Sequence, residues 1–234
     1  MLNILFIQGA QGAIGTSEIA AKTAKAAVEL NFFDLALKGG WIMVPIILLG
    51  FVAVYIFGER YYTIRKASKI DHSFMDQIKM LIHKGKIDEA VMLCRSNEAP
   101  VARMIEKGIS RIGRPLNDVN TAIENVGNLE ISKLEKGFPA LASVSGGAPM
   151  LGFLGTVIGM VQAFYNMSTA GSNVDVTILS GGIYLAMVTT VAGLIVGITA
   201  YFAYNILVAK VESVVFQMEA TTSEFMDLLH EPAK

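Results

Sequence analysis

Three long stretches without a charged side chain restrict what this sequence can fold into. They cover residues 39–58, 137–174 and 176–209, and none contains Asp, Glu, Lys, Arg or His. A membrane-spanning helix needs about 20 consecutive apolar residues, so each stretch is long enough to cross a bilayer. Charged residues make up 17% of the 234-residue chain and are concentrated outside these stretches. This pattern indicates membrane spans rather than one large soluble core.

The predicted fold class is an all-α membrane protein with three transmembrane helices and long helices extending into the cytoplasm. The predicted segments are an N-terminal amphipathic segment (1–38), transmembrane helix 1 (39–58), a helical region (59–137), transmembrane helix 2 (138–166), a loop (167–177), transmembrane helix 3 (178–208) and a C-terminal helix or tail (209–234).

Positive charges near the span ends predict the orientation. Arg60, Arg65 and Lys66 follow the first span, whereas the loop between the second and third spans has no Lys or Arg. Short loops rich in Lys and Arg stay in the cytoplasm, so residues 59–137 and the C-terminus are expected inside, and the N-terminus and loop 167–177 outside. The three cations are expected to fix topology at lipid headgroups, or to meet the short tail of a partner.

Apolar residues recur at helical spacing through the region between the first two spans. From Leu116 the pattern continues to Lys136 without a strong stop, which predicts one long helix entering the second span. At the other end of the chain, residues 16–37 have the pattern of an amphipathic helix. The sequence leaves open whether that helix lies on the membrane surface or belongs to a partly ordered leader.

The composition argues against several functional classes. The net charge is −1, and no basic cluster is interleaved with aromatic residues, so no nucleic-acid partner is expected. Cys94 is the single cysteine, and the histidines are scattered through charged segments. No P-loop, paired carboxylates or metal-ligand spacing occurs. We therefore predict no catalytic residue, no metal and no cofactor, and an enzyme is the least supported class.

Small residues and threonines line one face of each of the last two spans. The glycines and alanine predicted to form this stripe are Gly152, Gly155 and Gly159 in the second span and Ala186, Gly193 and Gly197 in the third. The hydroxyls beside it belong to Thr156, Thr189 and Thr190.

Two interpretations of the stripe remain open. Small residues let helices approach closely within a bilayer, and threonines often bond the preceding turn, so the stripes can be packing surfaces only. Alternatively, they line a shared cavity in which Thr156, Thr189 and Thr190 hand on a proton or orient a water. Proton pathways normally use an intramembrane carboxylate or histidine, which these spans lack. Either the protein moves no ions, or another chain supplies the titrating group.

Two motifs at these positions resemble the MotA/TolQ/ExbB proton-channel family. They are Gly146–Met160 in the second span and Ala186–Gly197 in the third, the latter followed by Tyr204-Asn205. The resemblance includes Gly39-Gly-Trp41 before the first span and Glu59-Arg60 after it.

The resemblance implies a homo-oligomer, a pentamer in this family, in the inner membrane of a Gram-negative bacterium. It also implies an ExbD/TolR-type partner with a single span that carries the proton-accepting aspartate. Proton flow would then energise a TonB-type protein and transport across the outer membrane. The pore threonines of the family correspond to Thr156 and Thr190, while Thr189 occupies a position that is often alanine.

The sequence departs from the family at two positions. Many members carry a glutamate where Leu185 stands and a proline where Thr199 stands, so no acid of this chain is expected in the pathway. The extension before the first span favours an ExbB-like subunit over a TolQ-like one, and a gliding-motility stator subunit remains an alternative. A non-conducting membrane scaffold is the alternative from a different class.

Overall fold

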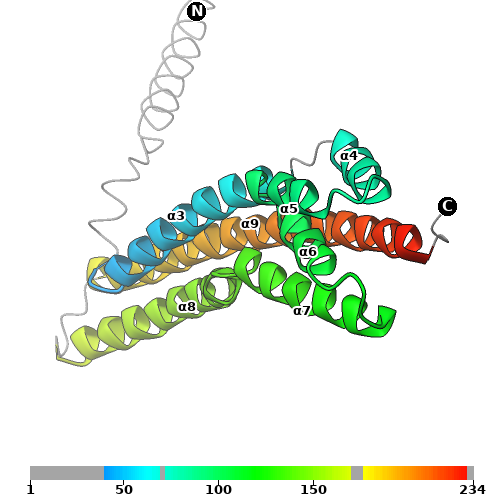
Figure 1. The fold of residues 1–234 in the computed structure, drawn as a ribbon. Coiled ribbons are helices and arrows are strands. Elements are labelled where there is room, and N and C mark those ends of the chain that lie inside the picture. The colour runs from blue at the N-terminus through cyan, green and yellow to red at the C-terminus, as the bar shows by residue number, and fades with distance from the viewer. Residues whose placement is uncertain (1–39, 69–71, 170–175, 231–234) are drawn as a thin grey trace, which may run out of the picture.

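The computed structural model describes residues 40–68, 72–169 and 176–230, and its regular elements within these ranges are all α-helices (Figure 1). The helices are α3 (Met43–Ala67), α4 (His72–His83), α5 (Ile87–Ser96), α6 (Pro100–Ile109), α7 (Leu116–Leu134), α8 (Phe138–Thr169) and α9 (Val176–His230). Three helical segments, in α3, α8 and α9, are long and apolar enough to cross a membrane. The predicted all-helical membrane fold is confirmed. The predicted helix over 16–37 and most of the predicted loop 167–177 lie outside the described residues.

Helices α3, α8 and α9 form the membrane bundle. Helix α9 packs on both of the others, and Ile46 of α3 is fully buried in this layer. Gly50 lets α3 approach α9 closely, because a Cβ atom there would lie 3.3 Å from Cγ2 of Val196. The outward faces carry exposed aromatic side chains such as Phe153 and Phe202, as expected where a helix meets lipid tails.

Helices α4, α6 and α7 pack against the second half of α9, beyond the spans, and α5 packs on α4 and α6 (Figure 1). Phe225 of α9 is fully buried there, and so is Ile123 of α7. Gly108 of α6 leaves room for both, since a Cβ atom at this position would lie 2.6 Å from Phe225 and 2.7 Å from Ile123. Helix α9 has 55 residues and is about 80 Å long at 1.5 Å per residue, so it belongs to both layers.

The expected continuous helix from Leu116 into the second span is wrong. Helix α7 ends at Leu134, and α8 begins at Phe138. Gly137 separates them with φ +93°, a left-handed conformation that glycine adopts easily and that commonly ends helices. Pro139 then stands in the first turn of α8, where a missing N–H costs little. Glycine closely followed by proline is a sequence signal for a helix end, and it outweighs the apolar periodicity here.

Candidate functional site

The two predicted stripes of small residues face each other in one antiparallel pair of helices. Each turn toward the C-terminus of α8 is matched by one turn toward the N-terminus of α9, and the two helices are in close contact at every turn. The contacts run from Ala163 against Gly182, through Gly159 against Ala186, Gly155 against Thr189 and Gly152 against Gly193, to Pro149 against Gly197. All six predicted stripe residues therefore lie in the α8–α9 contact.

The contact is too close for larger side chains at its centre. A Cβ atom on Gly155 would lie 2.3 Å from Oγ1 of Thr189, and one on Gly193 would lie 2.6 Å from the carbonyl oxygen of Ala148. The second clash is with backbone, which no change of side-chain rotamer can relieve. Close backbone approach of this kind is how helices associate within a bilayer, where apolar contact alone contributes little.

The three predicted pathway threonines differ in exposure and hydrogen bonding. Thr189 is fully buried between the helices, and its hydroxyl donates to the Ala186 carbonyl at 2.9 Å. Thr190 is half-buried and donates across the interface to the carbonyl of Gly152 at 3.0 Å. Thr156 is also half-buried and donates to the carbonyl of Phe153.

Thr156 and Thr190 lie at about the same level along the α8–α9 pair, because their neighbours Gly155 and Thr189 are in contact. Thr156 is one turn beyond Gly152, the residue whose carbonyl accepts from Thr190, and residues four apart share a helix face. A hydroxyl that donates its proton to a carbonyl can still accept hydrogen bonds on its oxygen. Both side chains can therefore accept a proton-bearing group, such as water or a protonated carboxyl, on the surface they leave exposed.

The Leu185 side chain lies near the start of α3 rather than in the α8–α9 contact. A Cβ atom on Gly40 would lie 3.7 Å from Cδ1 of Leu185, so this side chain contacts the chain just before α3. The position at which the family resemblance leads one to expect a glutamate is thus apolar here and packed toward the first span.

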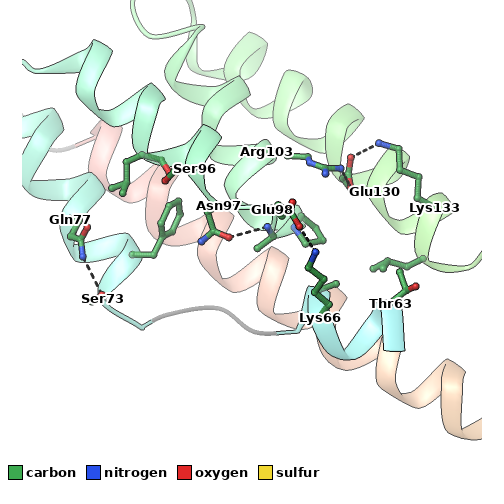
Figure 2. Close-up of a pocket in the computed structure, with 16 residues that line it drawn as sticks. Thr63, Lys66, Ser73, Gln77, Ser96, Asn97, Glu98, Arg103, Glu130 and Lys133 are labelled. Carbon is green, nitrogen blue, oxygen red and sulfur yellow. Dashed lines mark hydrogen bonds and ion pairs between the residues drawn. The ribbon is translucent and has the colours of Figure 1, made fainter. Parts of the chain in front are cut away.

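A second polar cluster lies where α3 leaves the membrane layer (Figure 2). It surrounds a cavity of about 610 Å³ between α3, α4, α5, α6 and α7. Lys66 of α3 forms an ion pair with Glu98, which lowers the pKa of that carboxyl. On the other wall, Glu130 of α7 accepts from Arg103 of α6 at 2.8 Å and from Lys133 at 2.6 Å.

Glu130 is the buried acid of this cluster, with 6% of its surface exposed. Burial raises the pKa of Glu130, but the hydrogen bonds from Lys133 and Arg103 outweigh burial and hold the pKa below its usual range. The carboxylate is therefore ionised at neutral pH. The pathway hypothesis did not include this residue, because ion pairs between distant helices leave no periodic signal in a sequence.

Arg60 connects the first span to the break between α7 and α8. Its guanidinium pairs with Glu59 at 2.7 Å and donates to the carbonyl of Lys133 at 3.3 Å, near the end of α7. Arg60 and Lys66 thus have partners within the chain, in addition to the predicted contacts with lipid or a partner tail. Arg65 is exposed.

Neutralising Glu130 tests the contribution of its cluster to stability. We expect Glu130→Gln to lower the free energy of unfolding at neutral pH by about 1–2 kcal/mol, since the partner cations are partly hydrated. The lowered pKa means that this stabilisation is present above about pH 4.3, the usual glutamate value, and is lost as pH falls through the lower folded value. The measurement is urea unfolding of the solubilised protein at pH 7 and pH 3. Glu212→Gln, at an exposed position, is the control. An equal loss for both variants at pH 7 would contradict the prediction.

No cluster of three or more His, Cys, Asp or Glu side chains that could hold a metal occurs within residues 40–68, 72–169 and 176–230. The site is thus a membrane interface with hydroxyl groups and carbonyls, beside an extramembrane ion-pair cluster.

Comparison with known proteins decides the family. A model described as the MotA/TolQ/ExbB proton channel family matches residues 96–220, which include α6, α7, α8 and most of α9. This chain belongs to that family. The matched region contains Thr156, Thr189, Thr190 and the whole α8–α9 contact.

Relatives from two branches of the MotA/TolQ/ExbB family are similar to this chain. The Tol-Pal system protein TolQ of Haemophilus influenzae is 29% identical over 221 residues, covering 88% of this chain and 96% of its own length. The putative biopolymer transport protein ExbB homolog of Methanothermobacter thermautotrophicus is 28% identical over 195 residues, covering 81% and 69%. The biopolymer transport protein ExbB of Neisseria gonorrhoeae is 30% identical over 135 residues, covering 52% and 61%. These names place the chain among the ExbB and TolQ members of a membrane transport family.

Proposed function

We propose that this chain is the ExbB-like subunit of a proton-driven motor in the inner membrane of a Gram-negative bacterium. The observation that carries the proposal is the hydroxyl pair of Thr156 and Thr190 on a helix pair whose spans contain no acid or histidine. Hydroxyls relay protons but do not store charge near neutral pH, so the pathway needs a titrating group from elsewhere.

That group belongs, in this proposal, to an ExbD/TolR-type partner whose single span carries an aspartate. Several copies of α8 and α9, in a homo-oligomer expected to be a pentamer, would surround the partner and present Thr156 and Thr190 to its carboxyl. Thr189 has no exposed surface in the chain, and its burial favours a packing role over a pathway role. The motor would act on a TonB-type protein to energise transport across the outer membrane.

A TolQ-like subunit is the second candidate. The TolQ relative aligns over nearly its whole length, whereas the segment before α3 favours the ExbB-like interpretation. Both candidates use the same proton pathway and differ in the partner with which the chain assembles.

Reconstitution in liposomes tests the proton pathway. We expect no proton leak from vesicles that hold this chain alone, because no group in its spans can carry the proton across. Adding the aspartate-bearing partner should produce a leak, and Asp→Asn in the partner should abolish it. The readout is a pH-sensitive dye inside the vesicles under an imposed potential. A leak from this chain alone would contradict the need for a partner's titrating group. No leak with the partner would contradict the proposal and favour the scaffold alternative.

A further inference from the structure

An apolar groove of about 760 Å³ runs between α3 and α9 in the membrane layer. Small buried side chains lie at its bottom, among them Ala53 of α3 and Ala200 of α9. Large exposed side chains border it on both helices, with Phe51 74% exposed and Phe202 62% exposed. The hydroxyl of Thr199 also lines the groove, but it donates to a carbonyl of its own helix. The groove therefore suits an apolar occupant.

The groove covers one half of the membrane layer. It extends over residues 47–57 of α3 and residues 195–206 of α9, which is about 15 Å at 1.5 Å per residue. The hydrocarbon core of a bilayer is about 30 Å thick, so one leaflet accounts for about 15 Å. The groove thus has the length of a lipid tail in a single leaflet, whereas another spanning helix needs about twice that length.

A lysine and a tyrosine stand at the end of the groove nearest the extramembrane helices. Lys210 is the first charged residue after the third uncharged stretch, one turn beyond Ile206. Its ammonium nitrogen lies 4.9 Å from the centre of the Tyr61 ring, and that ring lies 5.7 Å from the ring of Phe57, one turn earlier in α3. Residues four apart share a helix face, so Lys210 and Tyr61 continue the groove to the depth of the lipid headgroups.

The positive charge at this end has no carboxylate partner in the part of the chain that the structure describes. Neither Lys210 nor Arg65 forms an ion pair there. The carboxylates closest in sequence to the contact are Glu59 and Glu212, two residues from Tyr61 and Lys210 respectively. Residues two apart do not share a helix face, and Glu59 is already in an ion pair. An anion at the end of the groove therefore meets cations without a competing acid beside them.

The contact with the Tyr61 ring leaves Lys210 able to bind an anion. An ammonium group has three N–H donors, and a ring against one side of it leaves the others for oxygen atoms such as those of a phosphate. Lys210 is half-buried, so its aliphatic stem lies along the apolar groove while its charge is held at the groove's end. Arg65, one turn beyond Tyr61 on the same face of α3, adds a second exposed cation at this end.

We propose that the groove between α3 and α9 binds one tail of an anionic phospholipid, and that Lys210 and Arg65 bind its phosphate. The length of the groove matches the tail, and the unpaired cations favour a headgroup with net negative charge. The site lies in the leaflet next to the extramembrane helices. It does not depend on the proton pathway, because Thr156 and Thr190 belong to the α8–α9 contact.

Mass spectrometry of the intact solubilised protein tests the headgroup. The full-length chain is incubated with equal amounts of phosphatidylglycerol and phosphatidylcholine with the same tails, and the retained lipids are identified by mass. We expect phosphatidylglycerol to be retained in excess. Lys210→Gln and Arg65→Gln should each lower the ratio of the two lipids about fivefold. Lys136→Gln is the matched control, because this exposed lysine precedes the second span and does not line the groove; it should leave the ratio unchanged.

A second pair of variants tests the position of the tail. Thr199→Phe places a ring in the groove from an exposed position and leaves both cations unchanged, so it should lower the retention of both lipids about fivefold or more. Val191→Phe adds the same ring at an exposed position of α9 before the groove begins, and it should retain lipid as the unmodified chain does.

Thermal unfolding in mixed micelles supplies an independent measurement. A ligand that binds only the folded protein raises its melting temperature, so phosphatidylglycerol should stabilise the unmodified chain more than Lys210→Gln. An unchanged lipid ratio in Lys210→Gln, or full retention in Thr199→Phe, would overturn the proposal. So would an unmodified chain that retains no lipid and whose copy number changes in Thr199→Phe, because the groove would then be filled by a second copy of the chain.

Discussion

Gly193→Leu is expected to prevent α8 from packing on α9 and to give the largest loss of stability in the chain. A Cβ atom at this position would already lie 2.6 Å from the carbonyl oxygen of Ala148 and 2.9 Å from Cα of Gly152. Both atoms belong to the backbone, so the helices must move apart. Separation breaks the contacts along the whole pair, and we expect a cost of more than about 3 kcal/mol, beyond the usual range for overpacking.

The measurement is thermal unfolding of the solubilised protein, together with its level in membranes. Gly181→Leu is the matched control, because the same helix leaves open space around Gly181, with no atom within 4 Å of an added Cβ. Equal melting temperatures for the two variants would show that the close approach of α8 and α9 is not needed for folding.

Thr190→Val is expected to leave the protein folded and to reduce partner-dependent proton flux roughly tenfold or more. Valine keeps the β-branched shape but removes the hydroxyl that donates to the carbonyl of Gly152. The loss of this hydrogen bond should cost about 1 kcal/mol of stability. The larger effect is on flux, because a methyl group can neither accept nor pass on a proton.

Two further variants isolate the hydroxyl. Thr190→Ser restores it and should recover most of the flux. Thr199→Val removes a hydroxyl of the same helix that bonds its own backbone, at the carbonyl of Ile195, on the side that faces α3. That variant should conduct normally. Equal flux through Thr190→Val and Thr190→Ser would remove Thr190 from the pathway.

The membrane layer was largely predictable from the sequence, because its signals are local. Absence of charge over about twenty residues specifies a span whatever the rest of the chain does. Small residues three or four apart predicted that the last two spans would have packing faces, and the structure places Gly155 and Gly193 in one shared contact. The sequence alone did not separate Thr189, buried in that contact, from Thr190 at its edge. That distinction depends on how far one helix is rotated against the other.

The extramembrane layer was less predictable, because long-range contacts decide it. Glu130 pairs with Arg103, 27 residues earlier, and Arg60 reaches a carbonyl 73 residues later. Neither pairing leaves a periodic pattern. The helix break at Gly137 did leave a local signal, which the apolar periodicity on either side concealed.

The continuity of α9 has a mechanical consequence. Helix α3 ends at Ser68, beyond the first uncharged stretch, and α8 begins after the break at Gly137. Helix α9 has no such break, and it runs from Val176 to His230. Helix α9 is thus the one of the three spanning helices that continues as a single helix from the membrane layer into the extramembrane layer, whereas the helices of the other two spans end at breaks. A rotation of α9 near Thr190 would therefore be carried along its axis to Phe225 in the outer core. The proton-driven rearrangement proposed above would then reach the far end of the molecule without any intermediate segment having to fold or unfold.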